Sequence, residues 1–373
     1  MRRPIITLAL AASSLAAPLS AQPDGLSLGR GADPNDWESW FTLGDRLFQR
    51  QPRQAQAAFE WAARLDPTRA EPLLGRWATF YAQDQGSWIA LLQEDEEIRR
   101  RPQVISNELL YHRAHVRNPF VHRGLEMALY AMLGRRLWWD DGTAAFMNYG
   151  EGDFREAAQI FGRMVRRDPE RNLRFRHYRA LSWVGAGQVD SAIVELQTLL
   201  TALRRRDQQR VAYVYEAKSV WEHGLGLLYE ARGDSGQARQ AFQRALEEDL
   251  AWYPAWMGLA RLSLQAGLPA EAVEHLSHAV EIAPDDAVVR YEYGNALYAA
   301  GRLEEAAAEF RSALDLEPFW ADVPLRLGLA YDNLGQPQRA IPMYRAYLQR
   351  APRRHAQTIE RVRQRLAALE PGG

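Results

Sequence analysis

The sequence predicts an all-α solenoid of stacked helix pairs, and three rows of evenly spaced residues predict it. Alanines recur with a step of 34 residues at Ala238, Ala272, Ala306 and Ala340. The same step separates the glycines Gly233, Gly267, Gly301 and Gly335. It also separates the small residues Gly226, Ala260, Gly294 and Gly328. Such rows, in phase over four units, indicate a repeat architecture in which each unit buries its apolar face by stacking on its neighbours.

Each unit predicts two helices joined by a short turn. In residues 287–320, apolar residues recur three or four positions apart both before and after Gly301. Glycine adopts positive φ without strain, so Gly301 predicts the turn. We expect Gly294 and Ala306 where the two helices cross, because small side chains let the backbones approach.

This pattern resembles the tetratricopeptide repeat, a helix–turn–helix of 34 residues. The residues that match it in one unit are Leu225, Gly226, Tyr229, Ala238, Phe242 and Ala245. The resemblance implies a right-handed superhelix, in which the first helices line a concave face that commonly holds a peptide. Four units fit well: 219–252, 253–286, 287–320 and 321–354.

The rest of the chain is divided from the same pattern. We expect a signal peptide (1–21), a flexible leader (22–36), degenerate helix pairs (37–102), an irregular helical insert (103–137), two repeat-like units (138–206), four tandem units (207–354) and a capping helix with a tail (355–373). Residues 207–218 contain no Gly or Pro, so we expect them to lengthen the first helix of the next unit. Pro342 is expected to kink or shorten a second helix.

The N-terminus has the pattern of a secretory signal peptide. Arg2 and Arg3 precede an apolar run from Ile5 to Ala17, which is too short to span a bilayer, and Gln22 is the expected mature start. No cysteine is present for a lipid anchor. We therefore expect a bacterial periplasmic protein without stable membrane insertion after cleavage. Secretion beyond the envelope and an uncleaved N-terminal anchor remain as alternatives.

Composition excludes several classes of function. Without cysteine there are no disulfides, thiolate metal sites or cysteine nucleophiles. The 46 Lys and Arg residues are balanced by 47 Asp and Glu residues, whereas nucleic-acid binding needs a clear positive excess. No phosphate-binding loop, dinucleotide fingerprint or nucleophile elbow occurs. We therefore expect a scaffold that is not an enzyme and has no cofactor.

The resemblance places a set of polar and aromatic residues on the concave face. These candidates for binding a protein or peptide partner are His223, Arg261, Tyr291, Asn295, Tyr298, Asp332 and Asn333. Their mixture of rings and hydrogen-bonding groups suits apolar anchors and a peptide backbone. The alternative, that they form ordinary solvated helix surface, is left open by the sequence.

Two other functions compete with the scaffold. His112, His115 and His122 could form a metal or enzymatic site in residues 103–141, supported by the repeats. The His-x-x-His spacing is a weak signal, and ordinary histidines are favoured. The twelve Trp residues suggest a glycan binder as a third interpretation.

Overall fold

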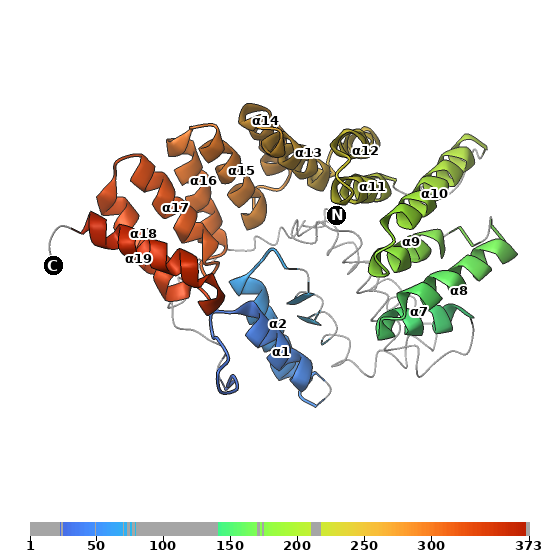
Figure 1. The fold of residues 1–373 in the computed structure, drawn as a ribbon, viewed down its shortest axis with the longest axis horizontal. Coiled ribbons are helices and arrows are strands. Elements are labelled where there is room, and N and C mark those ends of the chain that lie inside the picture. The colour runs from blue at the N-terminus through green and yellow to red at the C-terminus, as the bar shows by residue number, and fades with distance from the viewer. Residues whose placement is uncertain are drawn as a thin grey trace, which may run out of the picture.

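The computed structural model describes residues 23–69, 141–169, 172–209 and 218–370, except residues 24, 49 and 174, and also residues 71, 72, 75, 76 and 79. Within these residues every regular element is a helix (Figure 1). The predicted all-α repeat fold is confirmed. The predicted signal peptide, the insert 103–137 and its three histidines lie outside the described residues.

The helices follow one another in antiparallel pairs. The N-terminal pair is α1 (Trp37–Leu47) and α2 (Pro52–Leu65). Two further pairs are α7 (Asp141–Glu151) with α8 (Phe154–Arg167), and α9 (Phe175–Gly185) with α10 (Val189–Gln209). Next come α11 (Ser219–Ala231) and α12 (Ser235–Glu248), α13 (Tyr253–Gln265) and α14 (Pro269–Ile282), α15 (Ala287–Ala299) and α16 (Leu303–Leu316), and α17 (Asp322–Asn333) and α18 (Pro337–Arg350). The 3-10 turn η1 (Arg353–His355) leads into α19 (Ala356–Leu369).

From α7 to α19 the pairs form an arc (Figure 1). The first helix of each pair lies toward the inner side of the arc, and the second toward the outer side. Trp256 packs against both buried clusters, the one spanning α7 to α13 and the one spanning α13 to α19. The core is therefore continuous along the arc. None of the helices in the described ranges combines the length and apolar character needed to cross a membrane.

The turn glycines have the predicted conformation. Gly301 has φ 76°, and the N–H of Arg302 donates to the carbonyl of Leu297 at 2.9 Å, which closes the end of α15. The other three glycines of this row also have positive φ. The turn between the two helices of a unit is thus fixed by one residue type.

The small residues at the helix crossing serve a purpose different from the expected one. A Cβ atom added to Gly226 would lie 2.3 Å from the ring of Phe242, and one added to Gly294 would lie 2.6 Å from the ring of Phe310. Each glycine therefore makes room for an aromatic ring of the second helix. The close approach is between a backbone and a ring, not between two backbones.

Two expectations about helix length are wrong. Helix α11 begins at Ser219, so residues 207–218 do not lengthen it; residues 207–209 instead continue α10, whose apolar stripe stays buried as far as Leu203. Helix α18 contains Pro342 but has 14 residues, the same length as α12, α14 and α16, so the proline does not shorten it. A proline there removes the donor of one intrahelical hydrogen bond, and a kink at Pro342 stays a prediction.

The N-terminal pair packs on the other end of the arc. Phe319, in the loop before α17, is buried with its ring centroid 4.8 Å from that of Trp61 on α2. The guanidinium carbon of Arg64 lies 4.4 Å from the Phe319 ring centroid. Phe319 thus joins the small core that α1 and α2 share.

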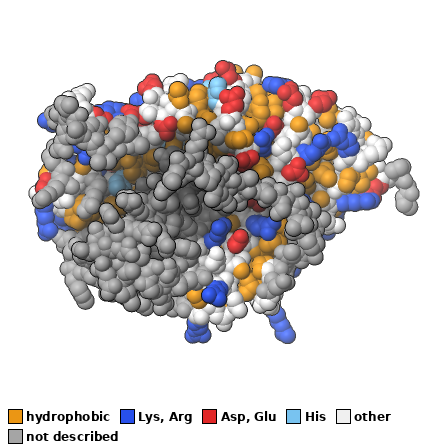
Figure 2. All heavy atoms as spheres, turned by 180° about the vertical axis from the view of Figure 1, so that it is seen from behind, with side chains coloured by type: hydrophobic (Ala, Val, Ile, Leu, Met, Phe, Trp, Pro, Cys, Tyr) orange, Lys and Arg blue, Asp and Glu red, His pale blue; other side chains and the backbone are white. Residues whose placement is uncertain are grey.

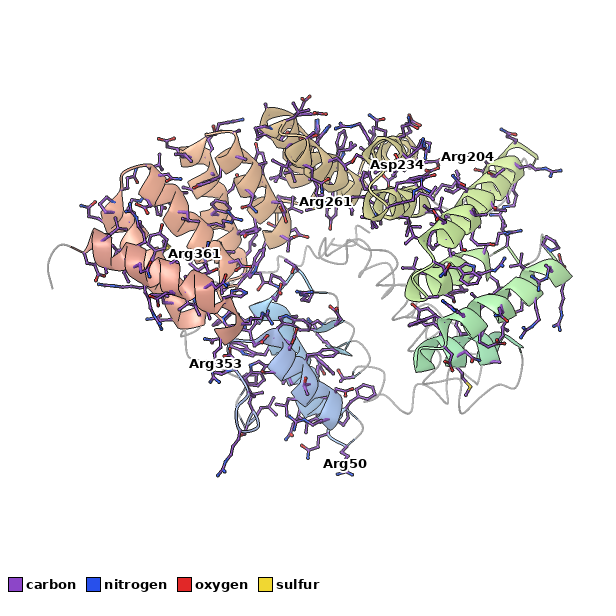
Figure 3. The ribbon with its side chains drawn as sticks, viewed as in Figure 1. Arg50, Arg204, Asp234, Arg261, Arg353 and Arg361 are labelled. Atoms are coloured by element: carbon purple, nitrogen blue, oxygen red, sulfur yellow. The ribbon has the colours of Figure 1, made fainter. Side chains whose placement is uncertain are left out.

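Polar contacts extend this packing along the loops. The N–H of Arg353 donates to the Asp33 carboxylate at 2.6 Å, and Arg354 pairs with Asp36. The side-chain amide of Asn35 donates to the carbonyl of Gln349 at 3.0 Å. Figure 3 shows Arg353 where α19 begins beside the N-terminal pair. We call this contact region between residues 33–69 and residues 319–355 the seam.

Candidate functional site

The inner face of the arc is formed by the first helices, and six of the seven predicted binding residues lie on three of them. Arg261 is on α13, and its label stands on the inner side of the arc (Figure 3). Tyr291, Asn295 and Tyr298 are on α15, and Asp332 and Asn333 are on α17. The structure therefore gathers these six on neighbouring helices. Most of them, however, are engaged with each other or with the adjacent repeat.

Arg261 is held by the preceding repeat. Its Nε and Nη2 donate to the two carboxylate oxygens of Glu230 on α11, at 2.6 and 2.5 Å. The side-chain amide of Gln265 donates to the same carboxylate at 3.3 Å. A two-pronged pair of this kind fixes both side chains. The guanidinium of Arg261 therefore links α11 to α13.

Two tyrosines of α15 are linked to α17 in the same manner. The side-chain amide of Asn333 donates to the hydroxyl of Tyr298, and Nε of Arg326 donates to the hydroxyl of Tyr291 at 3.4 Å. Burial raises the pKa of Tyr291, so its hydroxyl stays protonated. The Tyr291 ring centroid also lies 4.4 Å from that of Trp320.

Asp332 is linked to the cap helix. Nε and Nη2 of Arg365 on α19 each donate to its carboxylate at 2.7 Å, and the hydroxyl of Tyr344 donates at 3.0 Å. The hydrogen bonds from Arg365 hold the pKa of Asp332 below its usual range. Along the inner face, polar groups about one repeat apart thus satisfy each other. We call this row of bonds the polar ladder.

Asn295 is the exception in the polar ladder. Its side-chain carbonyl oxygen is buried and accepts no hydrogen bond from any residue that the structure describes. Unpaired buried acceptors are rare because losing water without a replacement bond costs about 1–3 kcal/mol. Among the six predicted residues on α13, α15 and α17, Asn295 is therefore the one with a buried, unpaired polar atom.

The family models for the tetratricopeptide repeat match residues 223–287, 263–323 and 325–353. The helix pairs, the glycine turns and the ring packed on a small residue occur in the same region. The chain is a tetratricopeptide-repeat protein. In tetratricopeptide-repeat arrays and other solenoids, the curvature of the stack creates an extended concave surface that is used for binding.

The solved structures to which this chain is similar include two that are described as tetratricopeptide-repeat proteins. A structure of YrrB, described as a tetratricopeptide-repeat protein with an unusual peptide-binding site, is 19% identical, with a TM-score of 0.42, and covers 52% of this chain and 93% of that one. The C-terminal part of a tetratricopeptide repeat-containing protein from Cytophaga hutchinsonii is 18% identical, with a TM-score of 0.46, and covers 56% and 78%. MamA is 18% identical, with a TM-score of 0.40, and covers 46% and 93%.

One curated relative matches part of the repeat protein. The Protein CTR9 homolog of Arabidopsis thaliana is 29% identical over 134 residues, which are 35% of this chain and 12% of that protein. The match therefore spans about an eighth of that relative's length.

The prediction that His223 lies on the concave face is wrong. Its side chain is 1% exposed and packs against the rings of Phe242 and Trp252 in the core of the repeat. Burial lowers its pKa to about 3, and the charge of Arg261 adds to the effect. A residue on the first helix of a tetratricopeptide repeat can face either the core or the concave face. The spacing of residues in the sequence did not show which of these His223 faces.

Sequence reasoning also missed a buried charged cluster where α10 meets α11. Glu222 is fully buried and accepts from Arg204 and, at 3.0 Å, from Arg244. Lys218, the chain's single lysine, lies 2.7 Å from Asp207 on α10. Buried charges persist only when paired, so these pairs fix the angle between the two helices. The sequence signal was Lys218 itself, an isolated lysine in an arginine-rich chain.

The described part of the surface in Figure 2 does not carry one dominant sign of charge. Figure 2 shows basic, acidic and hydrophobic side chains interspersed over the described part of one face. Among the described residues, no group of three His, Asp or Glu side chains could hold a metal ion. The alternative site built on His112, His115 and His122 lies outside them and stays a prediction.

Proposed function

We propose that this chain is a non-catalytic interaction scaffold of the bacterial cell envelope that binds a peptide or protein on its concave face. Asn295 carries the proposal. Its carbonyl oxygen lies beside the bonded groups of the polar ladder, and it lacks a donor among the described residues. Asn295 as a residue is only partly buried, so a turn of its side-chain amide would present the oxygen to a backbone N–H of an extended peptide, which would supply that donor.

The polar ladder supports a pre-formed binding face. Arg261 with Glu230, and Asp332 with Arg365, hold successive helices at fixed spacing before any partner arrives. A rigid groove loses less conformational entropy on binding than a mobile one. Affinity would then depend on a few anchors along the face, with Asn295 fixing the peptide backbone between them.

Photo-crosslinking tests where a partner binds. A photoreactive residue replaces Gln265, which is exposed on the inner helix α13, or Val194, which is 58% exposed on α10. We expect a discrete adduct in the native host from position 265 and none from position 194. The substitution Asn295→Ala should reduce the adduct at least fivefold, whereas Gln240→Ala, on the outer helix α12, should not. Equal adducts from both positions would contradict binding at the concave face.

The envelope location is supported by residues 1–21 alone, and it has its own test. We expect the protein recovered from the periplasmic fraction to begin at Gln22. Deleting residues 1–21 should keep the protein in the cytoplasm. Recovery from the medium would favour secretion, and an intact N-terminus would favour an uncleaved anchor.

A further inference from the structure

A cavity of about 230 Å³ lies at the seam. Trp37, Asp66 and Arg69 line it from the N-terminal pair, and Trp320, Asp322 and Arg354 line it from the other end of the chain. The cavity exists only while the seam is closed, because neither end encloses it alone. We call it the seam cavity.

One carboxylate in the lining of the seam cavity has no directly bonded partner. Arg69 pairs with Asp66 at 3.2 Å, and Arg354 pairs with Asp36. Asp322 is half-buried, and no residue in the described ranges makes a hydrogen bond or an ion pair with its carboxylate. One negative charge therefore faces the cavity without a direct counter-ion.

The pKa of Asp322 reflects its burial and the charges near it. Burial raises the pKa of Asp322, and the charge of Asp66 raises it further. His355, Arg326 and Arg354 act in the opposite direction without overcoming burial. A partly desolvated carboxylate gains most from a cation that makes a direct hydrogen bond to it.

We propose that the seam cavity binds an organic cation, a primary ammonium or a guanidinium group, with Asp322 as its counter-ion. A metal ion fits less well, because it needs several ligating side chains and the described residues offer no such group. An organic cation needs one carboxylate for its charge and apolar walls for its carbon atoms. Leu65, Ala321 and Pro352 supply apolar lining for these carbon atoms, while the Trp37 ring already lies beneath Arg69, whose guanidinium carbon is 5.2 Å from the ring centroid.

Binding at this site is coupled to closure of the seam. The walls come from residues that belong to opposite ends of the chain, so a ligand that touches both stabilises the closed form by mass action. The cation would therefore hold the N-terminal pair against α17. This coupling gives the experiment a second readout besides binding.

The binding test uses n-butylguanidinium and n-butylammonium, with n-butanol as the uncharged match. Fluorotryptophan labelling reports on Trp37 and Trp320 by ¹⁹F NMR, with Trp37→Phe and Trp320→Phe to assign their signals. We expect both cations, but not butanol, to shift these two signals saturably. Asp322→Asn, which keeps the shape and removes the charge, should weaken binding at least tenfold. Asp285→Asn, an exposed carboxylate of another repeat, should leave it unchanged.

The second readout is the seam itself. Because the chain lacks cysteine, Arg50→Cys and Arg361→Cys give a clean pair of spin-label sites, one on each side of the seam (Figure 3). The cations should narrow the distance distribution between the labels, and Asp322→Asn should abolish this change. The bound cation could be a lysine side chain of a partner or a free amine. Binding of a lysine-containing peptide, but not of the matched acetyl-lysine peptide, would favour the side chain. Absence of binding by the wild-type chain, or equal binding by Asp322→Asn, would overturn the proposal.

Discussion

Arg261 and Glu230 face each other across two neighbouring repeats, with both carboxylate oxygens of Glu230 accepting from the guanidinium at 2.6 and 2.5 Å. The pair is partly solvated, since the side chains are 37% and 17% exposed. Its value lies in setting the spacing of α11 and α13, because exposed ion pairs stabilise a fold only slightly.

A double-mutant cycle on Arg261→Ala and Glu230→Ala measures that coupling. We expect an interaction free energy of about 1 kcal/mol, at the upper end for a partly exposed pair because the geometry is two-pronged. Urea unfolding of the four proteins gives the value. A coupling within error of zero would show that the pair does not link the repeats energetically.

The glycines that face aromatic rings predict a contrast between two substitutions. Gly226→Ala places a Cβ 2.3 Å from the Phe242 ring and should cost about 1–3 kcal/mol in the free energy of unfolding. Gly236→Ala, where the nearest atom is 3.8 Å away, should stabilise α12 by up to about 1 kcal/mol.

A second variant separates ring overlap from other causes. Phe242→Leu removes the ring, so Gly226→Ala should cost less in that background than in the wild-type chain. Thermal or urea unfolding checks both values. Additive losses in the double variant would rule out the overlap with Phe242 as the cause.

The buried imidazole of His223 predicts acid sensitivity. Its pKa falls from the ordinary 6.5 to about 3, so the unfolded chain takes up a proton in this window before the folded chain does. The stabilising contribution is complete above pH 6.5 and is lost as the pH falls, by about 1.4 kcal/mol per pH unit. His223→Leu should remove that part of the slope.

The measurement is the free energy of unfolding between pH 6.5 and 4 for both proteins. His223→Phe serves as a second variant if leucine packs poorly against Phe242 and Trp252. Parallel pH profiles for wild type and both variants would mean that His223 takes up its proton equally in the folded and unfolded chains.

The packing of Phe319 predicts that this side chain stabilises the closed seam. Phe319→Ala empties the space between Trp61 and Arg64 and should cost about 3–5 kcal/mol. Backbone amides of α1 and α2 should exchange faster with solvent, while those of α13 and α14 keep their protection. Leu316→Ala, whose side chain is 38% exposed, is the matched control and should change neither. Unaltered exchange in α1 and α2 would show that the N-terminal pair does not depend on the seam.

The sequence by itself determined the helix pairs and their turns. Both depend on local information: apolar residues three or four apart, one glycine per turn, and a small residue on the first helix of each unit, which faces an aromatic ring in three of the four units. It also placed six candidates, among them Arg261 and Asn295, on neighbouring inner helices. Local spacing carries such features because each repeat contacts mainly the next one.

Only the tertiary structure decided which polar groups remain free and how the chain closes. Asp332 is engaged because Arg365 reaches it from the cap helix, while Asn295 has no described neighbour to donate to it. Asp33 and Arg353 are 320 residues apart, and they meet where Phe319 packs into the small core of α1 and α2. This contact joins two distant parts of the chain, so no single stretch of sequence encodes it.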